Sequence, residues 1–326
     1  TLCSGDDADC DLRAQKAAEG TFMYRAVRAM LRLPDAHALQ AQACRAVANV
    51  CAGYDPPSLS RRQRAVSAGF LPAAVKAMQS HEGNDVVLLQ ACRAVTNVSA
   101  GDDDAGLALS QYAAVADFLR PCARALSRFS RLAPLQESAL RAVVSVCSGA
   151  DARSAERRDE AAEAGILAAA VRAMSEHAEH AGVQEAACGA VVNVCFGLDP
   201  AGQARKDQVG TSPVFFEAAV RAINLHARNA AVQEQACRAV SVVCAGLSGA
   251  ACRHKERAVA SGFVEAAALA MNLHARAREP TVVKLRIQDQ ACWAVANVCE
   301  GDDGQASAER RQRAADVGFI AAAVRA

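Results

Sequence analysis

One recurring segment of this chain is apolar on every side but one. Between residues 42 and 51 the only polar residues are Gln42, Arg45 and Asn49, which are spaced i, i+3 and i+7. In an α-helix this spacing places them in a single stripe, while alanines, valines and cysteines cover the rest of the circumference. The pattern predicts an inner helix of a helical stack that meets water only along this stripe.

Two further helices precede each inner helix. The basic segment SRRQRAVSAG at 60–69 ends at a glycine that predicts a bend, and FLPAAVKAMQSH follows it at 70–81 as a second helix. A capping residue such as Asn84 or Asn229 then starts the third, inner helix, which ends at a glycine suited to a left-handed C′ position. No segment has the alternation of a β-strand, so the predicted fold class is all-α.

This three-helix pattern repeats along the whole chain. The glycine that ends the inner helix recurs at intervals of 48, 48, 48, 48, 49 and 55 residues, at Gly5, Gly53, Gly101, Gly149, Gly197, Gly246 and Gly301. The bend glycine recurs at Gly20, Gly69, Gly165, Gly262 and Gly318. Such a period predicts an α-solenoid. We expect a single solenoid over residues 1–326, with repeats at about 6–53, 54–101, 102–149, 150–197, 198–246 and 247–301 and a partial repeat at 302–326.

Both ends of the chain interrupt a repeat. The chain opens on TLCSG, which matches the end of an inner helix, and the partial repeat at 302–326 lacks an inner helix. Solenoids need end repeats with a polar outer face. We therefore expect a fragment of a longer array, with ends that promote self-association.

The repeat resembles the armadillo repeat, the unit of importin-α and β-catenin. Residues 61–78, RRQRAVSAGFLPAAVKAM, resemble its basic first helix, glycine bend and second helix, and residues 287–301, IQDQACWAVANVCEG, resemble its third helix, with a Trp followed four residues later by Asn. The resemblance covers the whole chain, although these repeats are longer than the usual armadillo repeat. It implies a right-handed superhelix and a protein-binding scaffold, in which the Asn bonds the backbone of an extended peptide and the Trp packs against its side chains.

Two positions per repeat match this binding pattern. The Trp position holds Arg45, Arg93, Arg141, Gly189, Arg238 and Trp293. The Asn position holds Asn49, Asn97, Ser145, Asn193, Val242 and Asn297. An amide offers one acceptor and two donor hydrogens, so it can pair with both groups of an extended peptide unit. We expect the polar members and Trp293 to line a groove for a protein or extended peptide.

The charge of this groove is expected to change along the chain. Two arginines follow a glutamate four residues earlier, as Glu137–Arg141 and Glu234–Arg238, and such pairs neutralise each other. Arg45 and Arg93 have no such glutamate, which predicts an acidic partner segment over the N-terminal half. At this position only Trp293 is aromatic, so the walls that would sandwich a Lys-rich nuclear localisation signal are missing, which argues against classical nuclear import.

Composition excludes several other classes of protein. The 326 residues are 52% hydrophobic and 4% aromatic, and 36 basic residues balance 35 acidic ones to a net charge of +1. A balanced charge and scarce aromatics argue against nucleic-acid binding. No apolar run approaches the roughly 18 residues of a membrane helix, so we expect no membrane insertion.

The fourteen cysteines are interpreted as packing residues. Four pairs lie seven residues apart, at Cys44/Cys51, Cys188/Cys195, Cys237/Cys244 and Cys292/Cys299. On a helix this separation is about 10 Å, too far for a disulfide bond, and no CxxC motif supports zinc. We expect buried, reduced thiols and a reducing compartment inside the cell: the cytoplasm, the nucleus or an organelle.

No catalytic motif, cofactor motif or metal site is found, so we expect no enzyme. The acidic clusters Asp102-Asp103-Asp104 and Asp302-Asp303 lack the spacing of a calcium loop and are interpreted as helix N-terminal charge. Four histidines close second helices and are interpreted as caps, at His81, His177, His226 and His274. The basic residues of the first helices are interpreted as a solvated edge: Arg61, Arg62, Arg64, Arg157, Arg158, Arg310, Arg311 and Arg313.

Two irregular repeats support an alternative function. In the third repeat GLALSQYAAVADFL at 106–119 replaces the basic helix, with Tyr112 in place of an arginine and Asp117 in place of the bend glycine. In the fifth repeat GTSPVFF at 210–216 disrupts the bend. If Tyr112, Phe215 and Phe216 point outward, they could dock a neighbouring subunit. The protein would then be a structural subunit of a larger assembly, held by its edges and ends, with the groove unused.

Overall fold

The computed structural model describes residues 13–17, 21–53, 56–101, 104–276, 281–301 and 303–325. These residues form α-helices joined by short turns, and no β-strand occurs among them. The predicted all-α class is confirmed. The predictions for Gly5, Gly20, Asp102, Asp103, Asp302 and the two chain ends fall outside the described residues.

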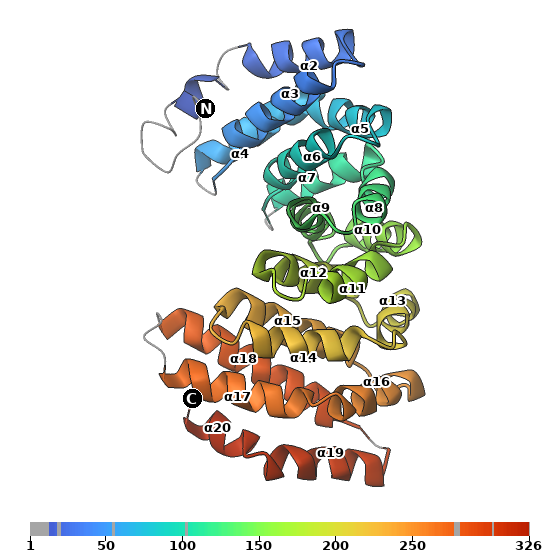
Figure 1. Cartoon of the computed structure of the whole chain (residues 1–326), viewed down its shortest axis with the longest axis vertical. Helices are drawn as coiled ribbons and strands as arrows, with labels where there is room; N and C mark the ends of the chain where they lie inside the picture. Colours follow the sequence, from blue (N-terminus) through green and yellow to red (C-terminus); the bar gives the residue numbers. More distant parts are fainter. Residues whose placement is uncertain are drawn as a thin grey trace. The chain divides into compact units, whose positions relative to one another are not determined.

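The chain divides into two compact units, which we describe separately: an N-terminal unit, Thr1–Ile166, and a C-terminal unit, Leu167–Ala326. Figure 1 shows the helices of both units. Those of the N-terminal unit are α2 (Phe22–Arg32), α3 (His37–Val50), α4 (Pro56–Ser67), α5 (Phe70–Ser80), α6 (Asp85–Val98), α7 (Asp104–Val115), α8 (Leu119–Arg128), α9 (Ala133–Val146) and α10 (Ala152–Glu163).

Helix α11 (Ile166–Glu176) starts at the last residue of the N-terminal unit. The other helices of the C-terminal unit are α12 (Ala181–Val194), α13 (Pro200–Gly210), α14 (Phe215–Leu225), α15 (Ala230–Val243), α16 (Gly249–Ala260), α17 (Phe263–Arg276), α18 (Thr281–Cys299), α19 (Gln305–Asp316) and α20 (Phe319–Arg325). At 19 residues α18 is longer than α12 and α15, which have 14 each.

Helices stack within each unit according to their place in the repeat. Third helices pack on third helices, as α3, α6 and α9 in the N-terminal unit and α12, α15 and α18 in the C-terminal unit. Second helices and first helices pack on their own kind as well, for example α14 on α17 and α13 on α16. This all-helical, repeated architecture is compatible with an α-solenoid.

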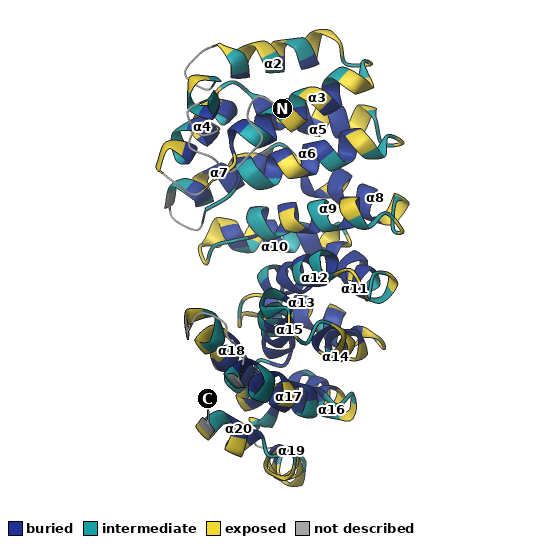
Figure 2. Cartoon of the chain, turned by 60° about the vertical axis from the view of Figure 1, so that its left-hand side comes forward, coloured by how far each residue is buried: buried dark blue, intermediate teal, exposed yellow. Residues whose placement is uncertain are grey.

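The third helices form the predicted inner layer. Most alanine, valine and cysteine residues of α6 and α12 are buried, as the colouring of these helices in Figure 2 shows. Each second helix adds a large apolar side chain near its start, and Phe70, Phe118, Phe215 and Phe263 are fully buried. Burying one such side chain contributes about 1.5–3 kcal/mol, so these residues fasten the second helices to the inner layer.

The bend between first and second helices depends on backbone conformation. Gly69 has φ 80°, a left-handed value, although no atom lies within 4 Å of where a Cβ would stand. Backbone strain, and not space, therefore selects glycine here. Asp117 takes the equivalent place in the third repeat at φ 59°, the only positive φ among the described non-glycine residues. The predicted bend forms in that repeat without glycine.

The structure corrects the prediction that the basic first helices are solvated edges. Arg61 is 1% exposed; its Nε donates to the Val50 carbonyl at 2.7 Å and its Nη2 to the Ala52 carbonyl at 2.9 Å. The buried cations that repeat both bonds on their own preceding helix are Arg157, Arg205 and Arg310. The end of a helix leaves carbonyls without partners and carries negative partial charge. These guanidinium groups therefore close the third helices, and only Arg64, Arg311 and Arg313 of the predicted set are exposed.

The ends of the second helices are closed by glutamines that sequence analysis did not single out. Gln40 Nε2 donates to the Met30 and Leu33 carbonyls at 2.9 Å each. The glutamines that make the equivalent bonds are Gln136, Gln184 and Gln233. Each glutamine lies on a third helix, so the bond joins the second and third helices of one repeat.

His81 and His226 are the C-cap residues of α5 and α14, as predicted, and the rings of three of the predicted histidines make a further contact that was not predicted. His81 Nε2 lies 2.7 Å from the Pro34 carbonyl of the preceding repeat. His226 and His274 make the same contact with Ala178 and Ala227 at 2.8 and 2.9 Å. These histidines therefore join neighbouring repeats.

The irregular fifth repeat differs from its prediction. Phe215 and Phe216 are 0% and 3% exposed and meet edge-to-face at 5.0 Å between ring centres. They start α14 as Phe70 starts α5, so they pack inward and cannot dock a subunit.

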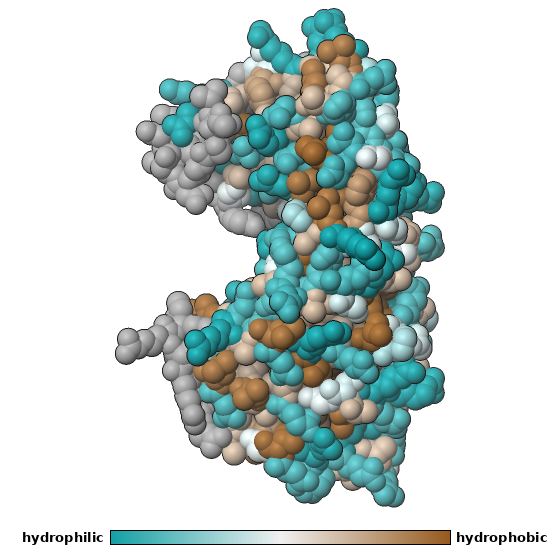
Figure 3. Space-filling model, in the orientation of Figure 1, coloured by the Kyte–Doolittle hydropathy of each residue, from teal (hydrophilic) through white to brown (hydrophobic). Residues whose placement is uncertain are grey.

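In the third repeat Tyr112 is 57% exposed, as expected. Figure 3 shows that other apolar residues stand among the hydrophilic ones on the visible face of each unit.

Among the described residues, no single helix is both long enough and apolar enough to cross a membrane. The bent pair α16 and α17 has the required length and apolar composition only when the two helices are taken together.

Candidate functional site

In the N-terminal unit the predicted groove residues lie on α3, α6 and α9. Arg45, Arg93 and Arg141 occupy the same place on these three helices, and all three are exposed. Packed helices lie about 8–10 Å apart, so the three guanidinium groups follow one another at roughly that interval. We name these three residues the arginine row.

The charges of the arginine row are balanced to different degrees. Arg141 Nε lies 3.1 Å from Glu137 Oε1, which confirms the predicted pair. Arg93 Nη1 donates to Gln90 Oε1 at 3.4 Å, a bond to a neutral group. Arg45 makes no hydrogen bond or ion pair with any described residue. Positive charge is therefore least compensated at Arg45 and Arg93.

The amides beside the row have a structural bond that was not predicted. Asn97 Nδ2 donates to the Ala48 carbonyl of the preceding third helix at 2.7 Å. This bond fixes the orientation of the amide and uses one of its two donor hydrogens. The other hydrogen and Oδ1 stay free for a peptide group, since the side chain is half-buried. Asn49 and Ser145 are half-buried at the equivalent positions of α3 and α9.

The C-terminal unit has a different row on α12, α15 and α18. Gly189 is buried, Arg238 is half-buried, and Trp293 is 63% exposed. Asn297 Nδ2 donates to the Ser241 carbonyl at 3.3 Å and to its Oγ at 2.8 Å, as Asn97 does to Ala48. Asn193 and Val242 are half-buried. This unit therefore offers an apolar and amide surface with one arginine.

The predicted Glu234–Arg238 pair is not the closest contact of Glu234. Arg238 Nη1 lies 4.0 Å from Glu234 Oε1, whereas Arg286 Nη2 lies 2.7 Å from the same oxygen. Arg286 lies near the start of α18, the longest of the third helices. The Glu234–Arg286 ion pair joins two repeats, so the spacing of residues within one helix could not reveal it. Exposed ion pairs of this kind contribute about 0–1 kcal/mol.

A hollow of about 640 Å³ lies beside Trp293. The residues that line it are Phe196, Gly197, Leu198, Lys206, Ser241, Val242, Ala245, Gly246, Leu247, Trp293, Asn297 and Glu300. Most of them stand at the C-terminal ends of third helices or in the loops that follow. Sequence analysis missed the loop residues and Lys206, because the groove pattern was sought only on the third helices.

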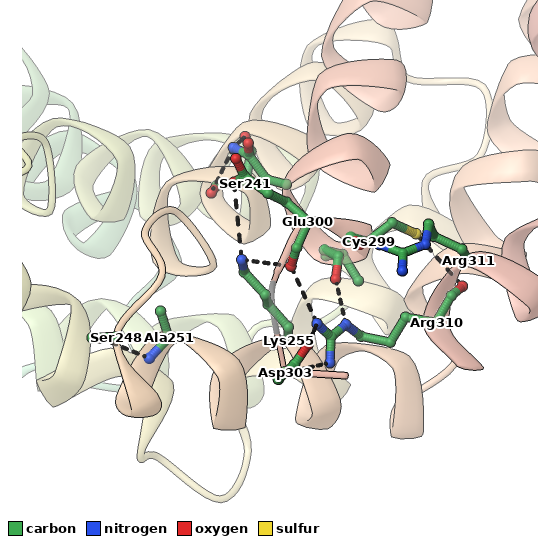
Figure 4. Close-up of polar contacts among 11 residues, drawn as sticks. Ser241, Ser248, Ala251, Lys255, Cys299, Glu300, Asp303, Arg310 and Arg311 are labelled. Atoms are coloured by element: carbon green, nitrogen blue, oxygen red, sulfur yellow. Dashed lines mark hydrogen bonds and ion pairs between the residues drawn. The ribbon is translucent and has the colours of Figure 1, made fainter. Parts of the chain in front are cut away.

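Figure 4 shows the polar contacts at the end of α18, at the edge of this hollow. Lys255 Nζ donates to the Glu300 carbonyl at 2.9 Å and lies 4.0 Å from Glu300 Oε2. Arg310 donates to the same carbonyl at 3.1 Å and to both oxygens of Asp303 at 2.8 and 2.9 Å. This bidentate bond lowers the pKa of Asp303 to about 2. The rim at Glu300 is thus held by two cations.

The described thiols of the third helices other than α18 are buried and free, as predicted. Burial raises the pKa of Cys44, Cys188 and Cys237 to about 12. The thiol of Cys195, at the helix end, contacts the Arg205 carbonyl at 3.6 Å, so it packs against the first helix of the next repeat. Cys292 and Cys299 are only half-buried, which differs from the prediction.

No three His, Cys, Asp or Glu side chains in the described part of the chain lie close enough together to hold a metal ion. Comparison of the sequence with models of protein families gives no match, and comparison with curated proteins gives none either.

Proposed function

We propose that both units consist of right-handed armadillo-type repeats and that the protein is a non-enzymatic scaffold for an extended partner polypeptide. The partner lies along the exposed stripe of the third helices. The arginine row carries this proposal: three exposed cations stand at one position of three adjacent helices, so that one acidic chain can contact all three.

The Asn97 amide supports a backbone contact. Because its bond to Ala48 already fixes the side chain, a peptide that pairs with Oδ1 immobilises little more of the protein, and preorganisation of this kind favours affinity. An extended chain rises about 3.3 Å per residue, so about three residues of the partner span one repeat. A segment of about ten residues would pass all three arginines.

The charge of the row supports an acidic segment in the N-terminal unit. No ion pair joins Arg45 or Arg93 to a carboxylate of the described residues, and a partner carboxylate would supply one. The free, buried thiols fit a reducing compartment inside the cell. The function needs no cofactor and no nucleic acid.

The proposal is tested with labelled peptides of about ten residues, acidic, neutral and basic, whose affinity for the whole chain is measured by fluorescence anisotropy. We expect the acidic peptides to bind tightest and to weaken between about 0.05 and 0.3 M salt, because screening shortens the range of the attraction. Equal affinity for acidic and basic peptides would refute an acidic partner.

A structural subunit held by its edges is the second candidate. Tyr112 favours it, since this aromatic side chain is 57% exposed and belongs to α7, a first helix of the repeat. Replacing Tyr112 by Ser would weaken such an assembly and leave the binding of acidic peptides unchanged. Size-exclusion chromatography compares the size of the assembly that forms with the unaltered chain and with Tyr112→Ser. A smaller assembly with Tyr112→Ser would favour the structural subunit over the peptide-binding scaffold.

A further inference from the structure

The hollow beside Trp293 has an exposed apolar wall. Phe196, Leu198, Leu247 and Trp293 are 47%, 81%, 59% and 63% exposed, and all four line it. Two loops supply the leucines at equivalent places, one residue after Gly197 and Gly246. Exposed apolar side chains that gather around one concavity mark a binding site, and this volume suits one or two large side chains.

Lys206 differs from its counterparts in other repeats. It is 1% exposed on α13 and lines the hollow. The equivalent Lys255 donates to the Glu300 carbonyl at 2.9 Å, and the equivalent Arg62 donates to the Ala100 carbonyl at 2.9 Å. No hydrogen bond or ion pair joins the Lys206 ammonium to any described residue. Burial lowers the pKa of Lys206, and the negative charges of Asp199 and Asp207, which form no ion pair with it, offset this only in part.

The nearby carboxylates have other partners. Asp199 Oδ1 accepts from the Gly202 amide at 2.9 Å, and Asp207 Oδ1 accepts from Gln203 Nε2 at 2.9 Å. Glu300 is 55% exposed at the rim, with its Oε2 4.0 Å from Lys255 Nζ. A buried ammonium without a paired anion is unfavourable unless a ligand completes it. The hollow therefore has one vacant charge contact at its wall.

We infer that this hollow binds an Asp or Glu side chain of the partner polypeptide together with a neighbouring large apolar side chain. The carboxylate pairs with Lys206, and the apolar side chain lies against Trp293, Leu198 and Leu247. The inference rests on the proposed scaffold function and adds that the C-terminal unit, despite its apolar row, also selects an acidic residue. Asn297 Oδ1 accepts from the peptide backbone, since its amide nitrogen is used by Ser241.

Trp293 is the only tryptophan of the chain, so its emission reports on this hollow alone. The probes are extended peptides, acetylated and amidated, in which Glu stands one to four residues from Leu. Matched panels carry Gln for Glu or Ala for Leu. We expect a Leu–Glu peptide to shift Trp293 emission to the blue with saturation, and both replacements to weaken binding about tenfold.

The matched variants are Lys206→Met and Lys284→Met. Lys206→Met should remove the preference for Glu over Gln and keep the emission shift, while Lys284→Met, on α18 outside the hollow, should change neither. Glu300→Gln should tighten Glu peptides by about two- to threefold by removing repulsion at the rim. Circular dichroism establishes that each variant is folded.

Three results would overturn the inference: no change in emission with any Leu–Glu peptide, equal affinity for Glu and Gln peptides, or an unchanged Glu preference in Lys206→Met. If the hollow binds only peptides that have a free C-terminal carboxylate, the carboxylate that pairs with Lys206 is not that of a side chain. These outcomes leave the arginine row untouched, because it is tested in the other unit with acidic peptides and without Trp293 as the reporter.

Discussion

The two units have the same arrangement of buried residues in their third helices but expose different side chains. In the N-terminal unit the stripe of the third helices carries Arg45, Arg93 and Arg141, all exposed. In the C-terminal unit the same positions hold a buried glycine, a half-buried arginine and an exposed tryptophan. The loops beside them add Phe196, Leu198 and Leu247 in the C-terminal unit.

The positions beneath the stripe do not differ in this way. Cys44 and Cys188 stand one residue before the variable position and are both fully buried. Arg61 and Arg205 close the third helices of the two units with the same two bonds. Residues that face the next helix are constrained by packing, whereas one stripe per repeat is free to change. The contrast teaches that the exposed stripe of this fold varies without altering the core.

The thiols test whether the inner layers of the two units are equally closed. At about pH 8 a thiol with a pKa of about 12 is almost entirely protonated. We expect Cys44 and Cys237 to react with iodoacetamide about a thousandfold more slowly than in the unfolded chain. Mass spectrometry of labelled peptides measures this, with half-buried Cys292 as the faster control. Rapid labelling of Cys44 or Cys237 in the native protein would contradict a closed inner layer.

The same thiols predict instability in alkali. Their pKa is raised on folding from a usual value of about 9, so the folded state holds protons that the unfolded state releases. The stabilisation is fully present below about pH 9 and is lost as the pH rises toward 12. Thermal melting between about pH 8 and 11 checks the direction, and a melting temperature that rises over this range would contradict it.

The buried arginines should contribute equally in both units. Arg61→Ala and Arg205→Ala each leave two helix-end carbonyls without a donor, and we expect a loss of about 3 kcal/mol in the free energy of unfolding. Arg64→Ala, on the exposed face of α4, should change it by less than about 0.5 kcal/mol. Urea unfolding measures all three. If only one of the two variants lowers the free energy of unfolding, the buried arginines do not have equivalent roles in the two units.

The asparagines sharpen the contrast between contact and charge. Asn97→Ala removes the hydrogen bond to Ala48 and the proposed contact with the peptide. We expect the free energy of unfolding to fall by about 1 kcal/mol and the free energy of peptide binding to weaken by a similar amount. The loss of affinity should not depend on salt, because no net charge is removed. Isothermal titration calorimetry at two ionic strengths checks this. A salt-dependent loss would mean that Asn97 acts through the arginines.

The smallest effect is expected at the irregular bend. Asp117→Gly relieves a left-handed φ of 59° at an exposed residue and should raise stability by about 0.5–1 kcal/mol. It also removes a weak contact with Arg120 at 3.7 Å, which offsets little. Thermal melting detects the gain. Gly69→Asp should show the opposite sign, and equal melting temperatures for both variants would argue against strain at the bend.

The fold was largely predictable from the sequence, because glycines at constant intervals mark the bends and the ends of the inner helices. The roles of the cations were not. Arg61 and Arg64 look alike in sequence, yet one is buried and the other exposed, since only the carbonyls of the preceding helix distinguish them. Phe215 and Phe216 looked displaced by the altered bend, but the start of α14 keeps its inward register.

The candidate site was predictable where it lies on third helices and not elsewhere. Arg45, Arg93 and Trp293 are exposed as the spacing indicated. Arg286 reaches Glu234 from 52 positions away, and Leu198 joins Leu247 at the hollow across two loops. Contacts between repeats depend on how the helices stack, which a period in the sequence does not specify.

A charge-exchange experiment tests most directly whether the arginine row binds an acidic peptide. Arg45→Glu with Arg93→Glu should weaken an acidic peptide by about 2 kcal/mol, and a matched peptide with lysines in place of its acids should regain most of that affinity. Glu137→Gln with Arg141→Gln is the control: it removes a pair whose two charges already offset each other, so a smaller loss is expected. If the double variant binds the acidic peptide as tightly as the unaltered chain does, the arginine row is not the binding surface and the account fails.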